Sequence, residues 1–178
     1  MNKINFKIII IAAAIIATTK QLSVASLIYN PSNKHYYELI SDNLDWETAK
    51  LQAQTHYYQN VQGHLATITS YSEQKFIENN VPITSGTWLG GFQPEGSPEP
   101  NGNWQWVTNE TWSYTNWLAG EPNNAGNEDY LTIYSNGGWN DVPGDWARPY
   151  LIEYDTPEPV TYIFLLIGSF LCTKKRRT

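Results

Sequence analysis

Residues 107–128 form a long stretch in which neither the helical nor the strand period can be recognised. The segments on either side are short runs of aromatic and β-branched residues bounded by Gly, Asn and Pro, a pattern typical of strands. A loop of that length inside a compact domain is usually functional. We therefore expect a domain of short elements that carries its function on one long loop.

Oxygen-bearing side chains gather at the end of this loop and soon after it, in the motifs Glu121-Pro122-Asn123, Glu128-Asp129 and Trp139-Asn140-Asp141. Calcium takes about six to eight oxygen ligands and tolerates irregular geometry, whereas zinc prefers nitrogen and sulfur donors. No histidine or cysteine lies in the same stretch. The pattern predicts a calcium site with the ligands Glu121, Asn123, Glu128, Asn140 and Asp141.

Each short motif alone would also fit a solvated loop, because Asn, Asp, Gly and Pro are common turn residues. Their order among other motifs is more specific. The others are Asp45-Trp46-Glu47-Thr48-Ala49, Gly63-His64-Leu65-Ala66-Thr67-Ile68, Trp88-Leu89-Gly90-Gly91, Gly102-Asn103-Trp104-Gln105-Trp106, Asn116-Trp117 and Tyr150-Leu151-Ile152-Glu153. In this order the set resembles the C-type lectin domain, over roughly residues 36–155.

The resemblance implies an α+β fold of the C-type lectin type, with two short helices, small antiparallel sheets and a long calcium-binding loop region. Local patterns agree with it. Trp46, Ala49 and Ala53 recur at helical spacing after a possible cap at Asp45, and residues 70–73 form a capping-box pattern. Strands are expected at residues 87–89, 104–107, 130–133 and 150–153.

The resemblance also implies a function, because Glu-Pro-Asn accompanies mannose, N-acetylglucosamine, glucose and fucose in this family. Two neighbouring sugar hydroxyls there bind the calcium and hydrogen-bond its ligands, and the peptide bond before the motif's proline is cis. The same five residues are thus expected to bind both metal and carbohydrate. A possible second calcium site would use Asn124, Glu128 and Asp129, with Glu95 as the one candidate acid from residues 93–103.

Cysteine usage departs from the family, since the only cysteine is Cys172. By motif position, the family's two disulfides would join residue 53 to 152 and residue 130 to 144, which are Ala and Ile, and Tyr and Gly, here. Eight tryptophans, all within residues 46–146, are the expected compensation. Trp88, Trp104 and Trp106 are expected in the core. His64 is interpreted as a packed histidine, while His35 and His56 show no partner pattern.

Both ends of the chain have the features of export signals. Residues 1–25 combine early lysines, an apolar run and small residues, which indicates a signal peptide. Residues 156–178 contain Pro157-Glu158-Pro159, an apolar segment and a basic run, and resemble the PEP-CTERM sorting tail of Gram-negative bacteria. The resemblance implies an exosortase-type processing enzyme as partner. Because thirteen apolar residues make a helix of only about 20 Å, transient inner-membrane anchoring is expected before release to the cell surface or matrix.

The remaining domain, residues 27–155, is strongly acidic. It keeps four basic and sixteen acidic residues, a net charge of about −12, which opposes binding to nucleic acid. Calcium-dependent binding of mannose-type glycans is the predicted function. One alternative is a calcium-stabilised structural or protein-binding domain of the same fold. An enzyme is not expected, because a glycosidase needs one carboxyl of raised pKa, and carboxylates that bind calcium are held ionised.

Overall fold

The structure is a computed structural model that describes residues 26–84 and 86–155. The predicted signal peptide and sorting tail both lie outside these residues. Within them, no helix is long and apolar enough to cross a membrane.

Both predicted helices are present, and each begins at its predicted cap. Helix α1 (Trp46–Ala53) starts after Asp45, whose side chain accepts the backbone N–H of Thr48 at 2.9 Å. Helix α2 (Tyr71–Asn80) starts after Ser70, which accepts the N–H of Glu73 at 3.2 Å. The capping box is only half formed, because Oε2 of Glu73 accepts the N–H of Thr69 instead of that of Ser70.

The strands are more numerous than the sequence patterns predicted, and most join one sheet of eight strands within the described residues. Its main path runs β1 (Ile28–Tyr29), β2 (Tyr36–Leu44), β10 (Arg148–Tyr154), β6 (Thr87–Phe92), β8 (Tyr130–Ile133) and β9 (Trp139–Val142). Strand β5 (His64–Leu65) pairs with β10, and β7 (Gln105–Trp106) pairs with β6. A separate hairpin joins β3 (Tyr57–Tyr58) to β4 (Val61–Gln62).

This arrangement confirms the α+β fold class but corrects one detail. The expected sheets were small and antiparallel, whereas β10 and β6 pair in parallel at the centre of the larger sheet. Strand β2 was missed because its sequence YYELISDNL contains Glu, Asp and Asn, which are depleted in strands. Its pairing with β10 supplies the hydrogen bonds and packing that local propensity lacks.

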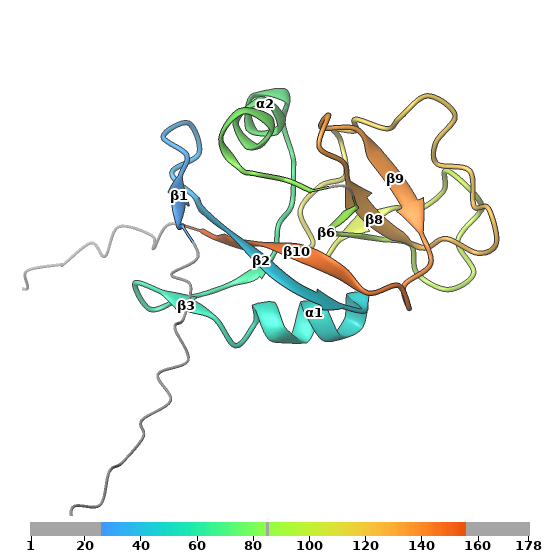
Figure 1. Cartoon of the computed structure of the whole chain (residues 1–178). Coiled ribbons are helices and arrows are strands. Elements are labelled where there is room, and N and C mark those ends of the chain that lie inside the picture. The colour runs from blue at the N-terminus through green and yellow to red at the C-terminus, as the bar shows by residue number, and fades with distance from the viewer. Residues whose placement is uncertain (1–25, 85, 156–178) are drawn as a thin grey trace, which may run out of the picture.

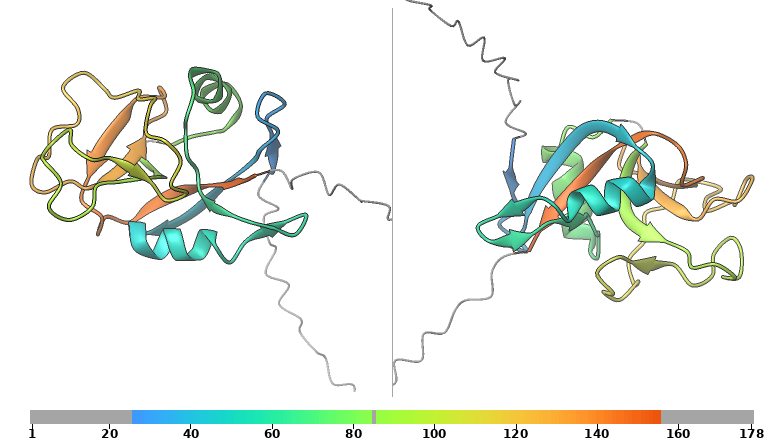
Figure 2. Two further views of the ribbon diagram at one scale, coloured as in Figure 1. Left: turned by 180° about the vertical axis from the view of Figure 1, so that it is seen from behind. Right: turned by 90° about the horizontal axis from the view of Figure 1, so that it is seen from below.

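The two helices lie on opposite sides of β2 and β10, while the long loop gathers around β8 and β9 at one end of the molecule (Figures 1 and 2). The core divides into two clusters. One contains Trp104, Trp106 and Trp139, and the other contains Trp46 and Trp88. The three tryptophans predicted to be core residues are at most 5% exposed, which confirms that prediction.

Packing occupies the positions where the family carries its disulfides. The ring of Tyr130 lies against Gly144, so closely that a β-carbon on the glycine would come within 2.4 Å of Tyr130 Cε2. Trp46 packs on Tyr130 with 4.7 Å between ring centroids. At the other pair of positions, Ala53 and Ile152 are both fully buried in one core cluster. Apolar and aromatic packing thus connects the elements that a cross-link would join.

Candidate functional site

The long loop reaches the sheet at Asp141, a fully buried residue of β9. Its carboxylate Oδ2 accepts the backbone N–H of Asn123 at 3.0 Å and that of Asn124 at 2.8 Å. A carboxylate that accepts two backbone N–H groups holds the loop in a defined position. Asp141 is therefore a structural anchor of the loop as well as a predicted metal ligand.

Three further predicted ligands lie beside this anchor. The Asn123 amide donates to the Glu121 carboxylate, and the N–H of Ala125 is shared between Asn123 Oδ1 at 2.7 Å and Glu128 Oε2 at 2.8 Å. The peptide bond between Glu121 and Pro122 is cis, as the resemblance implied. The structure thus brings Glu121, Asn123, Glu128 and Asp141 into one hydrogen-bonded group.

Negative charge is concentrated in this group. Partial burial raises the pKa of Glu121, and the nearby carboxylates of Asp141 and Glu128 raise it further. Burial is also the main cause of the raised pKa of Glu128, to which Asp141 adds. Like charges held close together are relieved either by protonation or by a bound cation. The electrostatics of the site therefore favour a cation.

The fifth predicted ligand, Asn140, supplies a direct test of whether the residues fit calcium. Its Oδ1 is buried and has no hydrogen-bond partner among the described residues. A buried acceptor without a partner is rare in folded proteins, and a bound ion would satisfy it. The five side chains offer only oxygen ligands, in agreement with the preferences of calcium. The residues present fit the ion.

Carboxylates alone do not define this site. Among residues 26–84 and 86–155, only one group of three His, Cys, Asp or Glu residues has all its ligand atoms within 4.8 Å of one another. That group is His35, Glu153 and Asp155, and it does not include the loop carboxylates. A cation at the loop site would therefore need amide oxygens as well as carboxylates. Asn123 would bind an ion through its Oδ1, because its amide nitrogen already donates a hydrogen bond to Glu121.

Two residues predicted for the second calcium site, Asn124 and Asp129, already make local hydrogen bonds. Asn124 Oδ1 accepts the N–H of Glu128 at 2.7 Å, and Asp129 Oδ2 accepts the Asn127 amide at 2.8 Å. These bonds order the turn between the two motifs. Each oxygen keeps a further lone pair with which it could bind an ion.

Sequence reasoning missed two residues beside this second set. One is Glu99: burial raises its pKa, and the carboxylates of Asp129 and Asp141 raise it further. Buried Gln93 donates its N–H to the carbonyl of Asp129 at 2.8 Å, and its own Oε1 has no described partner. The Pro98-Glu99-Pro100 sequence, which restrains the acid on both sides, was the available signal.

The tryptophans around the loop serve as its support. Trp139 is fully buried, donates from Nε1 to Gln74 Oε1 at 2.9 Å and pairs through its backbone with Trp117. Trp117 is half-buried and packs edge-on against Trp104 with 4.9 Å between centroids. Trp117 and Trp139 therefore hold the loop in place.

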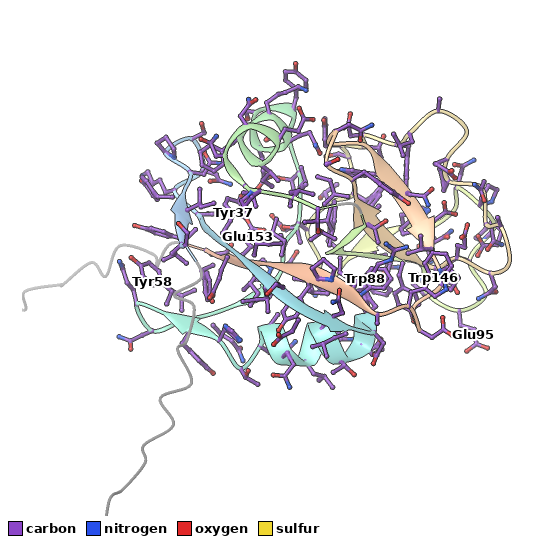
Figure 3. All side chains as sticks on the ribbon, viewed as in Figure 1. Tyr37, Tyr58, Trp88, Glu95, Trp146 and Glu153 are labelled. Carbon is purple, nitrogen blue, oxygen red and sulfur yellow. The ribbon has the colours of Figure 1, made fainter. Side chains whose placement is uncertain are left out.

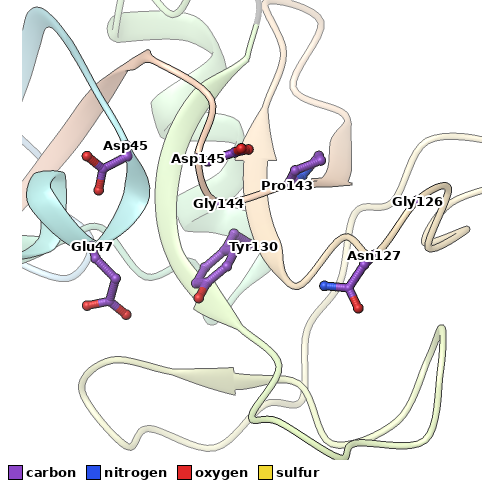
Figure 4. Close-up of a pocket in the computed structure, with 8 residues that line it drawn as sticks. All are labelled: Asp45, Glu47, Gly126, Asn127, Tyr130, Pro143, Gly144 and Asp145. Carbon is purple, nitrogen blue, oxygen red and sulfur yellow. The ribbon is translucent and has the colours of Figure 1, made fainter.

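An open pocket of about 580 Å³ lies beside the loop, between the start of α1 and the turn that precedes β8 (Figure 4). It is lined by Asp45, Glu47, Gly126, Asn127, Tyr130, Pro143, Gly144 and Asp145. None of the five predicted calcium ligands lines it. The candidate calcium site is therefore a neighbour of this pocket and not part of it.

The Lectin C-type domain family matches residues 42–153, and the chain belongs to this family. It is 29% identical to halomucin of Haloquadratum walsbyi over 145 residues, which are 72% of this chain and 2% of halomucin. It is 33% identical to the hepatic lectin of Gallus gallus over 126 residues, which are 69% of this chain and 56% of that lectin. The chain thus spans less than two thirds of the length of either relative.

Solved structures agree with the family assignment. The C-type carbohydrate-recognition domain of cow CD23, crystallised in the presence of a GlcNAc2Man3 oligosaccharide, matches with a TM-score of 0.62 and 25% identity. The match covers 74% of this chain and 95% of the CD23 chain. Domains of this family generally bind carbohydrate, and the hepatic lectin and the CD23 domain are lectins rather than enzymes.

Proposed function

We propose that this domain binds mannose-type sugars in a calcium-dependent manner through Glu121, Asn123, Glu128, Asn140 and Asp141. The observation that carries the proposal is the buried Oδ1 of Asn140, which has no hydrogen-bond partner among the described residues. The raised pKa values of Glu121 and Glu128, which come from burial and from nearby carboxylates, support it. The CD23 domain, which was crystallised with a mannose-containing oligosaccharide, supports the same class of ligand.

When bound, calcium would supply coordination positions for two neighbouring sugar hydroxyls. The protein's own groups supply the rest of the recognition. Ionised Glu121 can only accept hydrogen bonds, whereas the Asn123 amide can donate them. One side chain would therefore accept from one sugar hydroxyl and the other would donate to the second hydroxyl, and we call Glu121 and Asn123 the reading groups. Asp141 holds the backbone of Asn123 and Asn124, which keeps both reading groups in register with β9.

A mannose affinity column tests the proposal directly. The protein is expected to be retained with calcium and released by a chelator, and its melting temperature should rise with calcium because the ion binds only the folded state. Asn140→Ala should abolish retention. The matched control is Asn79→Ala, which removes an exposed asparagine from α2. Retention that survives both chelator and Asn140→Ala would contradict the proposal.

The alternative is a domain of the same fold that uses calcium for stability and binds no sugar. The hydrogen bonds that Asp141 and Glu128 already make to loop N–H groups favour it, because these bonds order the loop without any sugar. Calcium-dependent melting without retention on any glycan of an array would support this alternative. Turnover of an oligosaccharide would instead favour an enzyme, which the family relationship does not suggest.

We also propose that the domain acts outside the cytoplasm, on the basis of the terminal sequences alone. The predicted signal peptide would export it, and the PEP-CTERM-like tail would retain it in the inner membrane until an exosortase-type enzyme acts. Fractionation of cells that express the full chain tests this. Deletion of residues 156–178 should move the protein from the membrane fraction to the medium.

A further inference from the structure

A second group of metal-ligating side chains lies at the opposite end of β10 from the proposed sugar site. It consists of His35, His64, Glu153 and Asp155, none of which belongs to the proposed calcium site. No partner pattern for His35 was visible in the sequence, and the structure corrects that interpretation. Its Nδ1 lies 2.6 Å from Glu153 Oε1 and 3.5 Å from Asp155 Oδ1.

Strand register explains why the four side chains meet. Glu153 of β10 pairs with His64 of β5 on one side, so these two side chains share a face of the sheet. Asp155 follows Glu153 by two residues and therefore lies on the same face. On the other side, β10 pairs with β2 up to the Tyr154–Tyr36 pair, and continuing that register by one residue places His35 opposite Asp155.

His64 makes a hydrogen bond that selects, in the neutral ring, the tautomer that a metal ligand needs. Its Nδ1 lies 3.0 Å from the carbonyl oxygen of Leu65, which can only accept, so Nδ1 carries the proton. In the neutral ring this leaves a lone pair on Nε2. That atom is buried, has no hydrogen-bond partner among the described residues, and lies 3.5 Å from Asp155 Oδ1. Metal-binding histidines typically donate their other N–H to a backbone carbonyl in this way.

Glu153 is also oriented by its surroundings. It is 1% exposed and lies beside Tyr37 (Figure 3). Its Oε2 accepts the N–H of Thr67 at 2.9 Å, while Oε1 accepts the hydroxyl of Tyr37 at 3.1 Å and faces His35. These bonds leave Oε1 directed toward His35, and the ligand atoms of His35, Glu153 and Asp155 all lie within 4.8 Å of one another. The rim is partly open, because Asp155 is 56% exposed.

We propose that His35, Glu153 and Asp155, whose ligand atoms all lie within 4.8 Å of one another, form a site for a borderline divalent ion of the Zn²⁺ class, and that His64 Nε2 moves in from its position 3.5 Å from Asp155 Oδ1 as the fourth donor. Ligand distances of about 2.0–2.2 Å place neighbouring donors of a tetrahedral zinc site about 3.3–3.6 Å apart. Both distances from Asp155 to the histidines are 3.5 Å. The 2.6 Å contact between His35 and Glu153 is a hydrogen bond, and the ion would replace its proton while the donors separate by about 0.8 Å.

The donor set also separates this site from the calcium site. Two imidazoles with two carboxylates suit zinc, whereas calcium takes oxygen ligands. The two sites should therefore be occupied independently. The competing possibility is that the cluster holds only protons, with His35 and His64 as charged partners of the acids.

Zinc titration by calorimetry distinguishes a metal site from a proton-binding cluster. The full chain is used with Cys172→Ser, because a thiolate is a strong zinc ligand and this is the only cysteine. Excess calcium is present throughout to fill the loop. One zinc ion is expected per chain, and tetrahedral Co²⁺ absorption bands are expected on substitution with cobalt. His35→Gln, His64→Gln and Asp155→Asn should each weaken binding at least tenfold.

The third histidine provides a matched control. His56 also faces a carboxylate, with its Nδ1 3.5 Å from Glu38 Oε2, but it lies outside the cluster. His56→Gln should leave zinc affinity unchanged, and so should Asp141→Asn. Circular dichroism of each variant verifies that it is folded. The proposal is overturned if the parent binds no zinc, or if a folded His35→Gln or His64→Gln variant binds it as tightly as the parent does.

Discussion

The backbone N–H of Asn124 donates to the buried carboxylate of Asp141 at 2.8 Å, across seventeen residues of sequence. Together with the N–H of Asn123, this bond fastens the Glu-Pro-Asn turn to strand β9. The geometry of the candidate sugar site therefore depends on how the loop docks onto the sheet. Variants that alter the reading groups but keep this anchor are the most informative tests.

Exchange of the two reading groups should separate metal binding from sugar recognition. Glu121→Gln with Asn123→Asp keeps the oxygen atoms and the net charge, so calcium affinity is expected to survive. Mannose affinity should fall at least tenfold, because each hydroxyl then meets a group of the wrong hydrogen-bonding sense, at about 1–3 kcal/mol. Calorimetry with calcium and with mannose measures both. Unchanged mannose affinity would mean that these residues bind metal without reading sugar.

Glu99 should matter for a second calcium ion, because its pKa is raised by burial and then by the charges of Asp129 and Asp141. We expect Glu99→Gln to weaken the second of two calcium-binding steps several-fold, since it removes one charge from that site. Glu95→Gln is the matched control, an exposed acid in the same segment. Calcium titration by calorimetry gives the stoichiometry. A single calcium step in the parent protein would contradict the second site.

The contact between Tyr130 and Gly144 should be intolerant of added volume. In Gly144→Ala the new β-carbon would lie 2.4 Å from Tyr130 Cε2, and Trp46, which packs on Tyr130 with 4.7 Å between ring centroids, limits how far that ring can move. Overpacking of this kind costs about 1–3 kcal/mol in the free energy of unfolding. Urea denaturation measures the loss. Asp145→Ala, at the exposed neighbouring position, should change stability little.

Glu73 should make the chelator-treated protein less stable as pH rises. Burial raises its pKa to about 7, Glu153 adds to the shift, and hydrogen bonds from Tyr37 and Thr69 oppose it. A carboxyl whose pKa is raised on folding contributes stability below its unfolded pKa of about 4.5 and loses it as pH rises through 7.

Urea denaturation in chelator should therefore show the free energy of unfolding falling by about 1–3 kcal/mol from pH 5 to pH 8. The raised pKa values of His35 and His64 act in the same direction over this range. Glu47→Gln, an exposed acid on α1, serves as control and should keep the same pH profile. Stability that rises between pH 5 and pH 8 would contradict the assignment to Glu73.

The sequence by itself determined the features whose signals are local. The caps at Asp45 and Ser70 lie beside the helices that they start, strand β8 has the predicted limits Tyr130–Ile133, and the order of short motifs identified the family. The five proposed calcium ligands were selected the same way, because residue type and spacing alone define an oxygen-only set.

Tertiary structure decided the features that depend on register and burial. Burial and the charges of Asp129 and Asp141 raise the pKa of Glu99, Glu73 accepts the N–H of Thr69 instead of that of its helix cap, and strand β2 exists despite weak propensity because β10 pairs with it. His35 and His64 meet Asp155 for the same reason, since one strand between β2 and β5 aligns residues that are distant in sequence. Cross-strand alignment is set by the hydrogen bonds and packing of the whole sheet, which no local pattern contains.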